Sequence, residues 1–332
     1  MSKTPENINF SRSIEVYKTS IDRRLIALLD GRKPAFVYDP IHYVFKTGGK
    51  RMRAILLLLA SESVGGKTAP ALDAACAIEF LHNFTLVHDD IMDRSDLRRG
   101  LPTVHKKWNV DTAILSGDQI AAFGYTLLLK TKTPRLADIL HAFTEAFMEV
   151  CEGQALDIEF ETCSDISIDD YLSMIGKKTA RMISASMEIG GIIGGGAARE
   201  VKALRRYGEF LGLAFQLQDD ILDIDGNEKT LGKVIGKDII EGKRTFLLLL
   251  AQQRAKGSDR ILIEKVLKRR CDGNDEINRV REIYERYGIL GDARKEMERN
   301  TLQAQKALRV LPVNRAVSTL SWLSDKLLKR QS

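Results

Sequence analysis

The chain of 332 residues contains little proline, little cysteine and few aromatic side chains. It has only 7 prolines and 4 cysteines, and Phe, Trp and Tyr make up 7% of its residues. Scarce proline with plentiful Leu, Ala, Ile, Lys and Glu favours long helices over a sandwich of short strands. The cysteines have neither CxxC nor metal-ligand spacing, which argues against a zinc module and predicts a reduced, cytoplasmic protein.

Long hydrophobic runs are also missing. The longest aliphatic run, AILLLLA at 54–60, is far shorter than the roughly 20 residues of a membrane span, so we expect no transmembrane helix. The first residues, MSKTPENINF, lack the apolar segment of a secretory signal. The basic clusters KALRR (202–206) and KRR (268–270) have no interleaved aromatic residues. We therefore expect solvated helix faces there and no nucleic-acid partner.

Helical periodicity is abundant. It predicts long helices at 70–93, 110–130, 135–161, 168–195 and 199–225, and two or three amphipathic helices within 275–331. Asp169 and Asp170 are the N-cap candidates of the 168–195 segment. Its glycines between 190 and 196 follow no strand and lack the phosphate-loop pattern, so they are expected to allow close helix packing or a turn. With no linker or repeat, the prediction is a single all-α domain over residues 1–332.

Two acidic clusters interrupt these apolar helices, LVHDDIMD at 86–93 and QLQDDILD at 216–223. On an ideal helix Asp89 and Asp93 lie about 40° apart, with His82 between them in projection, while Asp90 lies about 100° round from Asp89. Asp219 and Asp223 repeat the spacing. Like charges four residues apart destabilise a helix unless something compensates them. A solvated acidic helix end could explain one cluster but explains two poorly.

A divalent metal is the simplest compensating charge. Mg²⁺ prefers oxygen ligands and usually takes one or two carboxylates plus substrate phosphates, so the repeated DDxxD pattern predicts a site that grips a polyphosphate through Mg²⁺. The phosphate charge that the metal does not neutralise requires Lys and Arg. Four segments supply these residues beside glycines or acids: GGKRMR (48–53), DLRRG (96–100), GKKT (176–179) and LGKVIGKDIIEGKRT (231–245).

These motifs, in this order, resemble those of the trans-isoprenyl diphosphate synthase family. The resemblance spans about residues 40–250 by motif. The first acidic motif has two residues between its acids, and LVHDDIMD is followed by LRRGLPTVH, which is most similar to the archaeal-type geranylgeranyl diphosphate synthases. The resemblance implies the isoprenoid-synthase fold, a helical bundle or barrel with a central apolar cavity, and a homodimer.

The resemblance also implies a role for individual residues. The metal ligands would be Asp89, Asp90 and Asp93 from one helix and Asp219, Asp220 and Asp223 from the other, holding three Mg²⁺ ions with substrate bound. The allylic diphosphate (dimethylallyl, geranyl or farnesyl) would contact Arg98, Lys178, Lys233 and Lys243. Isopentenyl diphosphate would contact Lys50, Arg53, His82 and Arg99. The catalytic residues would be Lys178, Thr179 and Gln216, the last two with oxygens over the reacting carbons.

The implied reaction is ionisation, condensation and elimination. The allylic C–O bond ionises, the double bond of isopentenyl diphosphate attacks the carbocation, and a proton is then lost. No covalent nucleophile is required, which fits the lack of any Ser–His–Asp or Cys–His pattern. The chain departs from the family pattern at Ala54, where proline is frequent, and at Lys237, where a small hydroxyl residue is common.

Product length would be set by side chains below the first aspartates. Phe84 is the fifth residue before Asp89 and Thr85 the fourth, with Leu81 another turn away. In the family, an aromatic followed by a small residue at these positions resembles the C20-producing type. An ideal helix puts Phe84 about 140° from Asp89, so geometry alone favours Thr85 as the residue underneath. Phe84 could also be ordinary core packing.

Several alternatives remain open at this point. The main product is expected to be geranylgeranyl diphosphate, with a C15 or mixed C15/C20 product as the alternative. A terpene cyclase would usually have Asn, Ser or Thr with Glu at its second metal site, whereas this chain has a second DDxxD. An inactive regulatory subunit would be expected to lose acids or phosphate-binding residues, and none is missing here.

Overall fold

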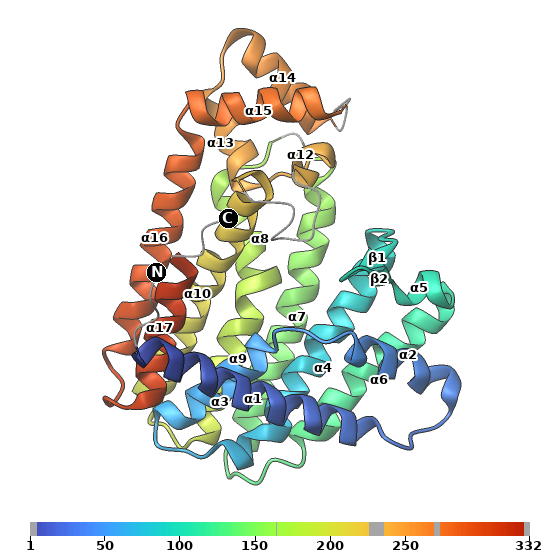
Figure 1. The fold of residues 1–332 in the computed structure, drawn as a ribbon, viewed down its shortest axis with the longest axis vertical. Helices are drawn as coiled ribbons and strands as arrows, with labels where there is room; N and C mark the ends of the chain where they lie inside the picture. The colour runs from blue at the N-terminus through green and yellow to red at the C-terminus, as the bar shows by residue number, and fades with distance from the viewer. Residues whose placement is uncertain (1–4, 164, 226–235, 269–272, 329–332) are drawn as a thin grey trace. The chain divides into compact units, whose positions relative to one another are not determined.

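The helix-rich composition yields an all-α protein, as predicted. The computed structural model describes residues 5–163, 165–225, 236–268 and 273–328, and its ribbon is drawn in Figure 1. Within these ranges the strands are confined to one two-stranded hairpin. None of the helices in the described part of the chain combines the length and apolarity that a membrane crossing requires. Cys76 is buried as a free thiol.

The chain divides into two compact units. The first unit comprises Met1–Phe147, Ala185–Arg205 and Val310–Leu320, and the second comprises Met148–Ser184, Arg206–Arg309 and Ser321–Ser332. Within the described residues, four helices contribute to both units: α7 (Leu136–Phe160), α9 (Arg181–Ile193), α10 (Ala198–Asp225) and α17 (Arg315–Leu328). The expectation of one domain over the whole chain stays a prediction.

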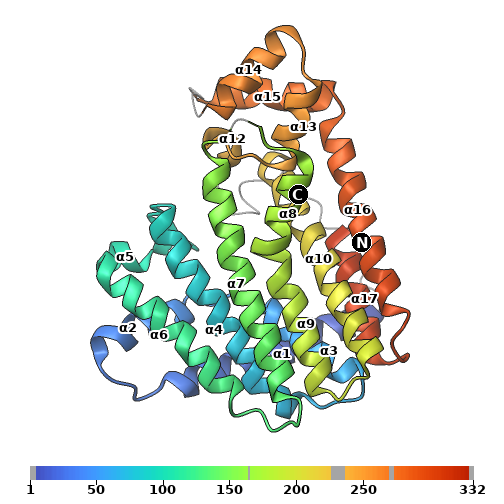
Figure 2. The same ribbon diagram turned by 180° about the vertical axis from the view of Figure 1, so that it is seen from behind.

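The first unit is built around α4 (Thr68–Met92). Its other elements are α1 (Pro5–Leu29), α2 (Ala35–Lys46), α3 (Met52–Ser63), β1 (Leu97–Arg98), β2 (Leu101–Pro102), α5 (Val104–Lys107) and α6 (Val110–Leu128). The helices α4 and α6 run side by side in Figures 1 and 2, and α3 also packs on α4. The small and apolar residues of α4 face this core, since Ala74, Ile78 and Leu81 are fully buried and Thr85 is buried.

Glycines bring α9 close to its neighbours in the first unit. A methyl group on Gly190 would lie 2.2 Å from the carbonyl oxygen of Leu57 in α3, and one on Gly194 would lie 2.5 Å from that of Ser61. Gly195 then ends the helix with a φ of +80°. The prediction of close packing and a turn at these glycines is confirmed, since larger side chains would force the helices apart.

The second unit holds α8 (Ile168–Ile175), a π-helix η1 (Gly176–Ala180), α12 (Lys237–Ile240), α13 (Phe246–Arg254), α14 (Gly257–Leu267), α15 (Asn274–Arg286), α16 (Ile289–Leu308) and most of α17 (Arg315–Leu328). The helices α13, α14 and α15 lie together in both views, in contact with one another. Buried aliphatic side chains of α13, among them Leu247, Leu248 and Leu249, form its core beside the second acidic motif.

Some sequence expectations need correction. The N-cap of α8 is Ser167, not Asp169 or Asp170, because Ser167 and Asp170 form a capping box in which each side chain accepts the other's backbone N–H. The helix expected to open after Pro70 begins at Thr68, and proline is tolerated in a first turn. The three helices α15, α16 and α17 confirm the expected helical tail. In KALRR the basic residues Lys202, Arg205 and Arg206 are exposed, as expected, whereas Arg269 and Arg270 lie outside the described residues.

Candidate active site

The first acidic motif occupies the last turn of α4. The helix is unbroken up to Met92, and Asp93 is its C-cap, whose N–H donates to the carbonyl oxygen of Asp89 at 2.8 Å. This bond confirms that Asp89 and Asp93 lie one helical turn apart. Asp89 is half-buried and Asp93 is exposed, while Asp90 is only 4% exposed. Two carboxylates are thus presented at the helix end, and a third points inward.

A short hairpin places two arginines beside these acids. Its turn residues Arg99 and Gly100 have φ angles of +54° and +76°, as in the type I′ turns that join two strands tightly. The Nε of Arg98 donates to both carboxylate oxygens of Asp90, at 2.9 and 2.8 Å, and Nη2 lies 2.8 Å from Oδ1. Arg99 turns away from the acids and donates to the carbonyl oxygen of Gly48. The hairpin was not predicted, although a glycine after two arginines is a turn signal.

The basic segment GGKRMR contains one buried arginine with a structural role, Arg51, and one exposed lysine, Lys50. Arg51 is 4% exposed and donates to Asp22 at 2.8 Å and to the carbonyl oxygen of Phe45 at 3.0 Å. Its Nη1 also lies 3.5 Å from Glu79, which is 2% exposed. Lys50, by contrast, is exposed. The guanidinium of Arg99 packs against Gly49, where a methyl group would lie 3.1 Å from Nη2. Arg51 therefore anchors the loop that presents Lys50.

Arg53 and His82 form a pair beneath this loop, with Nη1 and Nε2 at 3.2 Å. Burial, followed by the charge of Arg53 and then of Arg99, Arg98 and Arg51, holds the pKa of His82 well below its usual 6.5. The neutral imidazole can therefore accept from Arg53. The Nε of Arg53 is buried without a hydrogen-bond partner. The structure thus concentrates positive charge around His82, as a site for an anion requires.

Glu79 compensates this charge from below. Its burial raises the pKa of the carboxyl group, while Arg51 and Arg53 act in the opposite direction. The backbone N–H of Ala54 also donates to Glu79, at 3.5 Å. A proline at this position would have no N–H to give, so the departure from the family pattern adds a contact here.

The three residues predicted to control product length lie on α4 as expected. Phe84 is 8% exposed, and its ring centroid is 4.9 Å from that of Phe147. The hydroxyl of Thr85 donates to the carbonyl oxygen of His82 at 2.9 Å, within its own helix. Leu81 is fully buried. Their control of product length stays a prediction.

In the second unit, the π-helix η1 carries the GKKT motif. Two glycines on neighbouring helices make room for it. A methyl group on Gly153 of α7 would lie 2.4 Å from the backbone nitrogen of Lys178, and one on Gly212 of α10 would lie 2.4 Å from the Cα of Ala180. Single π-turns inside helices are frequent at functional sites. The wider turn was not predicted, because it depends on contacts with helices distant in the sequence.

The catalytic candidates form one hydrogen-bonded chain. Thr179 donates to Gln216 Oε1 at 3.0 Å, and Gln216 Nε2 donates to Asp220 Oδ1 at 3.1 Å. The hydroxyl of Tyr171 donates to Asp220 Oδ2. The structure thus brings Thr179 and Gln216 together, as the resemblance implied.

Lys178 stands beside an acid that the sequence analysis missed. Its Nζ lies 2.5 Å from Asp157 Oδ2, in an ion pair between η1 and α7. Asp157 and Tyr171 both hold predicted site residues, yet neither belongs to a motif. Each is one polar residue on a charge-laced helix, so no sequence signal separates it from a solvated residue.

The second acidic motif is crowded with negative charge. Burial, with Asp238 and Asp219 nearby, raises the pKa of Asp220 well above its usual value. Asp219 is exposed, and Asp223 Oδ2 accepts from the backbone N–H of Asp238 at 3.1 Å. Carboxylates that raise one another's pKa are a donor set suited to a divalent cation, which would relieve the repulsion. Among the residues that the structure describes, no group of three or more His, Cys, Asp or Glu side chains is placed to hold a metal ion.

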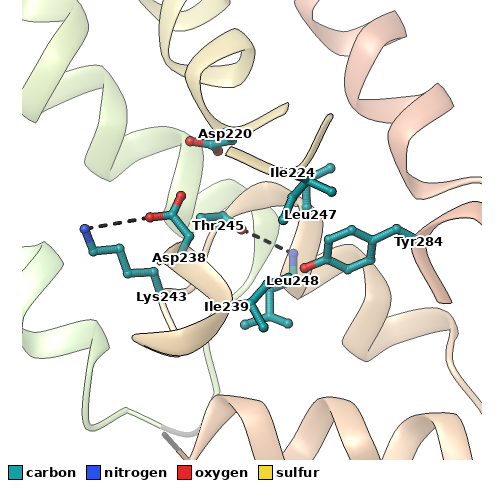
Figure 3. A pocket seen from close by; sticks show the side chains of 9 residues that line it. All are labelled: Asp220, Ile224, Asp238, Ile239, Lys243, Thr245, Leu247, Leu248 and Tyr284. Carbon is teal, nitrogen blue, oxygen red and sulfur yellow. Dashed lines mark hydrogen bonds and ion pairs between the residues drawn. The ribbon is translucent and has the colours of Figure 1, made fainter. Parts of the chain in front are cut away.

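A small pocket adjoins this motif, drawn in Figure 3. Asp220, Asp238 and Lys243 line one side, and aliphatic side chains with Tyr284 line the other. Lys243 Nζ is 3.9 Å from Asp238 and 3.2 Å from Glu241. Burial opposes its charge, but Asp238 and Glu241 outweigh that effect and raise the pKa of Lys243. Lys233, the other lysine predicted nearby, lies outside the described residues.

Lys237, the second departure from the family pattern, makes a local contact. Its Nζ lies 3.2 Å from Glu241, four residues on, and the side chain is 54% exposed. Glu241 is also paired with Lys243, and these two lysines hold its pKa below the usual value against the opposing effect of burial. The extra lysine therefore shares an acid with a predicted substrate-binding lysine.

The family follows from comparison with known proteins. A family model described as polyprenyl synthetase matches residues 34–286. The chain belongs to the polyprenyl synthetase family. The resemblance seen in its motifs is thereby confirmed.

Three relatives show how far the similarity extends. A short chain isoprenyl diphosphate synthase of Methanothermobacter thermautotrophicus is 36% identical over 95% of this chain and 97% of its own length. A geranylgeranyl diphosphate synthase of Methanosarcina mazei is 40% identical over 70% of this chain and 73% of its own. The crystal structure of a geranylgeranyl pyrophosphate synthetase from Pyrococcus horikoshii superposes with a TM-score of 0.92 at 35% identity, covering 97% of this chain and 98% of that one.

Proposed function

We propose that this polyprenyl synthetase is a Mg²⁺-dependent prenyltransferase that condenses isopentenyl diphosphate with allylic diphosphates, mainly to geranylgeranyl diphosphate. The observation that carries the proposal is the concentration of positive charge beside the first acidic motif. Four arginines, Arg51, Arg53, Arg98 and Arg99, all act on the pKa of His82. Such a site suits a diphosphate, since charge-assisted hydrogen bonds from arginine to phosphate are strong and geometrically specific.

The carboxylates Asp89, Asp93, Asp219 and Asp223 would hold the metal, in three ions with substrate bound. When bound, Mg²⁺ neutralises the negative charge that builds on the departing diphosphate. Asp90 and Asp220 are proposed as further ligands. In the structure each already accepts a hydrogen bond, Asp90 from Arg98 and Asp220 from Tyr171, which fixes their orientation.

The chain's own residues then act on the two substrates. Arg98, Lys178 and Lys243, with Lys233, would bind the allylic diphosphate and stabilise it as its C–O bond breaks. Lys50, Arg53, His82 and Arg99 would hold isopentenyl diphosphate so that its double bond attacks the allylic carbocation.

The oxygens of Thr179 and Gln216 lie close together and would face the developing positive charge. One C–C bond forms, and the proton lost from the condensed carbocation passes to the released diphosphate. No covalent intermediate with the protein is needed.

Product length is the finer part of the proposal. The relatives carry both general and specific names, a short chain isoprenyl diphosphate synthase and geranylgeranyl diphosphate synthases. The aromatic ring of Phe84 followed by the small Thr85 supports a C20 product, with a C15 or mixed product as the alternative.

Purified protein with labelled isopentenyl diphosphate, farnesyl diphosphate and Mg²⁺ tests both parts by product chromatography. Labelled C20 product is expected. No elongation would contradict the proposed activity, and a C15 or C25 end product would contradict only the length.

We also infer that the protein is a homodimer acting in the cytoplasm. The helix α6 exposes Ile114 at 42% and Leu115 at 50%, and its C-cap residue Leu129 is 60% exposed. Exposed apolar residues gathered on one helix favour burial against a partner. Light scattering after size exclusion is expected to give twice the 37.2 kDa mass of one chain. A mass of one chain would contradict the dimer.

A further inference from the structure

The ring of Phe84 contacts two other rings of the first unit. One belongs to His88, the residue one helical turn further along α4, with ring centroids 4.6 Å apart and planes at 58°. The other belongs to Phe147 of α7, with centroids 4.9 Å apart and planes at 70°. Aromatic pairs at this separation prefer tilted and edge-to-face arrangements such as these. We name these three residues the His88–Phe84–Phe147 stack.

A glycine on the adjoining helix α6, Gly117, leaves space for the imidazole ring of His88. A methyl group on Gly117 of α6 would lie 2.2 Å from Nε2 of His88 and 2.5 Å from its Cδ2. The imidazole therefore occupies the space that a side chain at 117 would take. His88 Nε2 also lies 3.4 Å from the carbonyl oxygen of Ile114 and 3.9 Å from Asp118. The absent side chain at Gly117 leaves His88 in contact with α6 and over the ring of Phe84.

We propose that Phe147, and Gly117 through His88, are positioning residues that fix the ring of Phe84 and thereby set product length. A phenylalanine on a helix has more than one allowed rotamer, and contacts with two neighbouring rings favour one of them. With the ring fixed, the growing chain meets a stop at a single depth. Without support the ring can turn aside, and the chain can grow further. The inference rests on the proposed function, because it concerns the length of that reaction's product.

The same helices offer matched controls. Phe143 lies one turn before Phe147 on α7, but its ring pairs with Tyr125, at 5.0 Å, and not with Phe84. Gly124 lies two turns beyond Gly117 on α6, and a methyl group there would lie 3.2 Å from Phe143. Substitutions at 143 and 124 therefore disturb the packing of α6 and α7 without touching the His88–Phe84–Phe147 stack.

The decisive experiment measures the chain length of the products of purified variants with farnesyl diphosphate, labelled isopentenyl diphosphate and Mg²⁺. Phe147→Ala and Phe84→Ala are both expected to move the main product from C20 to longer chains, whereas Phe147→Tyr is expected to keep C20. The double variant Phe84→Ala with Phe147→Ala is expected to give the distribution of Phe84→Ala alone, because Phe147 acts through Phe84. Phe143→Leu and Gly124→Ala are expected to keep C20.

Gly117→Ala tests the contact between His88 and Phe84. Displacing the imidazole is expected to raise the share of products longer than C20, and to have no such effect in the Phe84→Ala background. Should Phe147→Ala fail to fold, Phe147→Leu removes the ring while keeping an apolar side chain, with the same expected lengthening.

The outcomes distinguish a failure of this inference from a failure of the proposed function. A wild-type enzyme that makes C20, with Phe147→Ala and Phe147→Leu making the same C20, would overturn the inference alone. A double variant whose products are longer than those of Phe84→Ala would also overturn the inference. Control variants at 143 and 124 that lengthen the product as much as Phe147→Ala would do the same. A wild-type protein that elongates nothing would overturn the proposed function, and the inference with it.

Discussion

Single residues decide where charge can be buried beneath the first acidic motif. Arg51 shares its guanidinium between Glu79, which is 2% exposed, and Asp22, whose side chain is 31% exposed. Removing one partner of a buried pair leaves an uncompensated charge, whereas a half-exposed partner is replaced by water. Glu79 and Asp22, the two acids that contact Arg51, therefore differ in how much they contribute to the stability of the protein.

Glu79→Gln is expected to destabilise the protein by about 1–3 kcal/mol, because it leaves Arg51 and Arg53 without the buried carboxylate. Asp22→Asn serves as the control and is expected to lose less than about 1 kcal/mol. Denaturant unfolding of both variants measures the difference. Equal losses would show that Glu79 does not compensate the arginines.

The state of His82 gives a pH dependence whose direction can be stated. Burial and the nearby arginines hold its pKa well below 6.5, so the folded protein keeps it neutral where the unfolded chain takes up a proton. Its contribution to stability is complete above about pH 6.5 and is lost as the pH falls below that value, at up to about 1.4 kcal/mol per pH unit.

His82→Gln is therefore expected to lose less stability than the wild type between pH 6.5 and pH 5, as measured by denaturant unfolding at each pH. His141→Gln is the control, because His141 is an exposed residue of α7. A wild-type slope in His82→Gln would contradict the assignment.

Residues within one regular helix could be placed from the sequence. The positions of Phe84 and Asp89 on α4, and of Asp93 at its C-cap, followed from helical spacing alone, because α4 is unbroken up to Met92. Glu79 and Asp157 could not be found that way. Each owes its role to an arginine or lysine more than twenty residues away in the chain, and spacing within one helix carries no information about such a partner.

At the scale of the element, glycines on α7 and α10 hold the π-helix η1. Gly153→Ala is expected to lower kcat by about 100-fold, because its methyl group collides with the backbone of Lys178 and displaces the catalytic segment. Gly291→Ala in α16 meets nothing within 4 Å. This control is expected to keep kcat and to gain up to about 1 kcal/mol of stability. Steady-state kinetics with thermal unfolding distinguish them, and equal kcat values would contradict the role of Gly153.

The arginine hairpin depends on a turn that glycine accommodates. Gly100→Ala is expected to cost about 1 kcal/mol of stability through strain at φ +76°, and to raise KM for the diphosphate substrates by misplacing Arg98 and Arg99. Gly31→Ala has the same strain, at φ +67° with nothing within 4 Å, but lies in the loop between α1 and α2. It should lose similar stability with unchanged KM. Equal KM values for Gly100→Ala and Gly31→Ala would contradict the role of the hairpin in placing the two arginines.

Elements differed in how well the sequence predicted them. Apolar periodicity predicted both ends of α4, α6, α7 and α10 to within two residues, because the buried faces of these helices impose that periodicity. The hairpin and the π-turn were missed. Their strands are two residues long, and the π-turn is stabilised by Gly153 and Gly212 from other helices, so neither leaves a periodic signal.

At the scale of the whole molecule, the acidic motifs lie on α4 and α10 and belong to different compact units. The family places the chain among polyprenyl synthetases, and the proposed reaction requires both motifs to act on the same diphosphate. Repetition of DDxxD in the sequence predicts such cooperation. The central proposal is that both motifs are needed for the same reaction step.

Coupling between the motifs is the most direct test of that claim. The measurement is kcat for elongation of farnesyl diphosphate with Mg²⁺ in Asp89→Asn, Asp219→Asn and the double variant. Each single change is expected to lower kcat by about 100- to 1,000-fold. The double variant is expected to lose little more than either single, as residues that act as a unit do. Losses that multiply in the double variant, or a single variant with wild-type kcat, would contradict the claim.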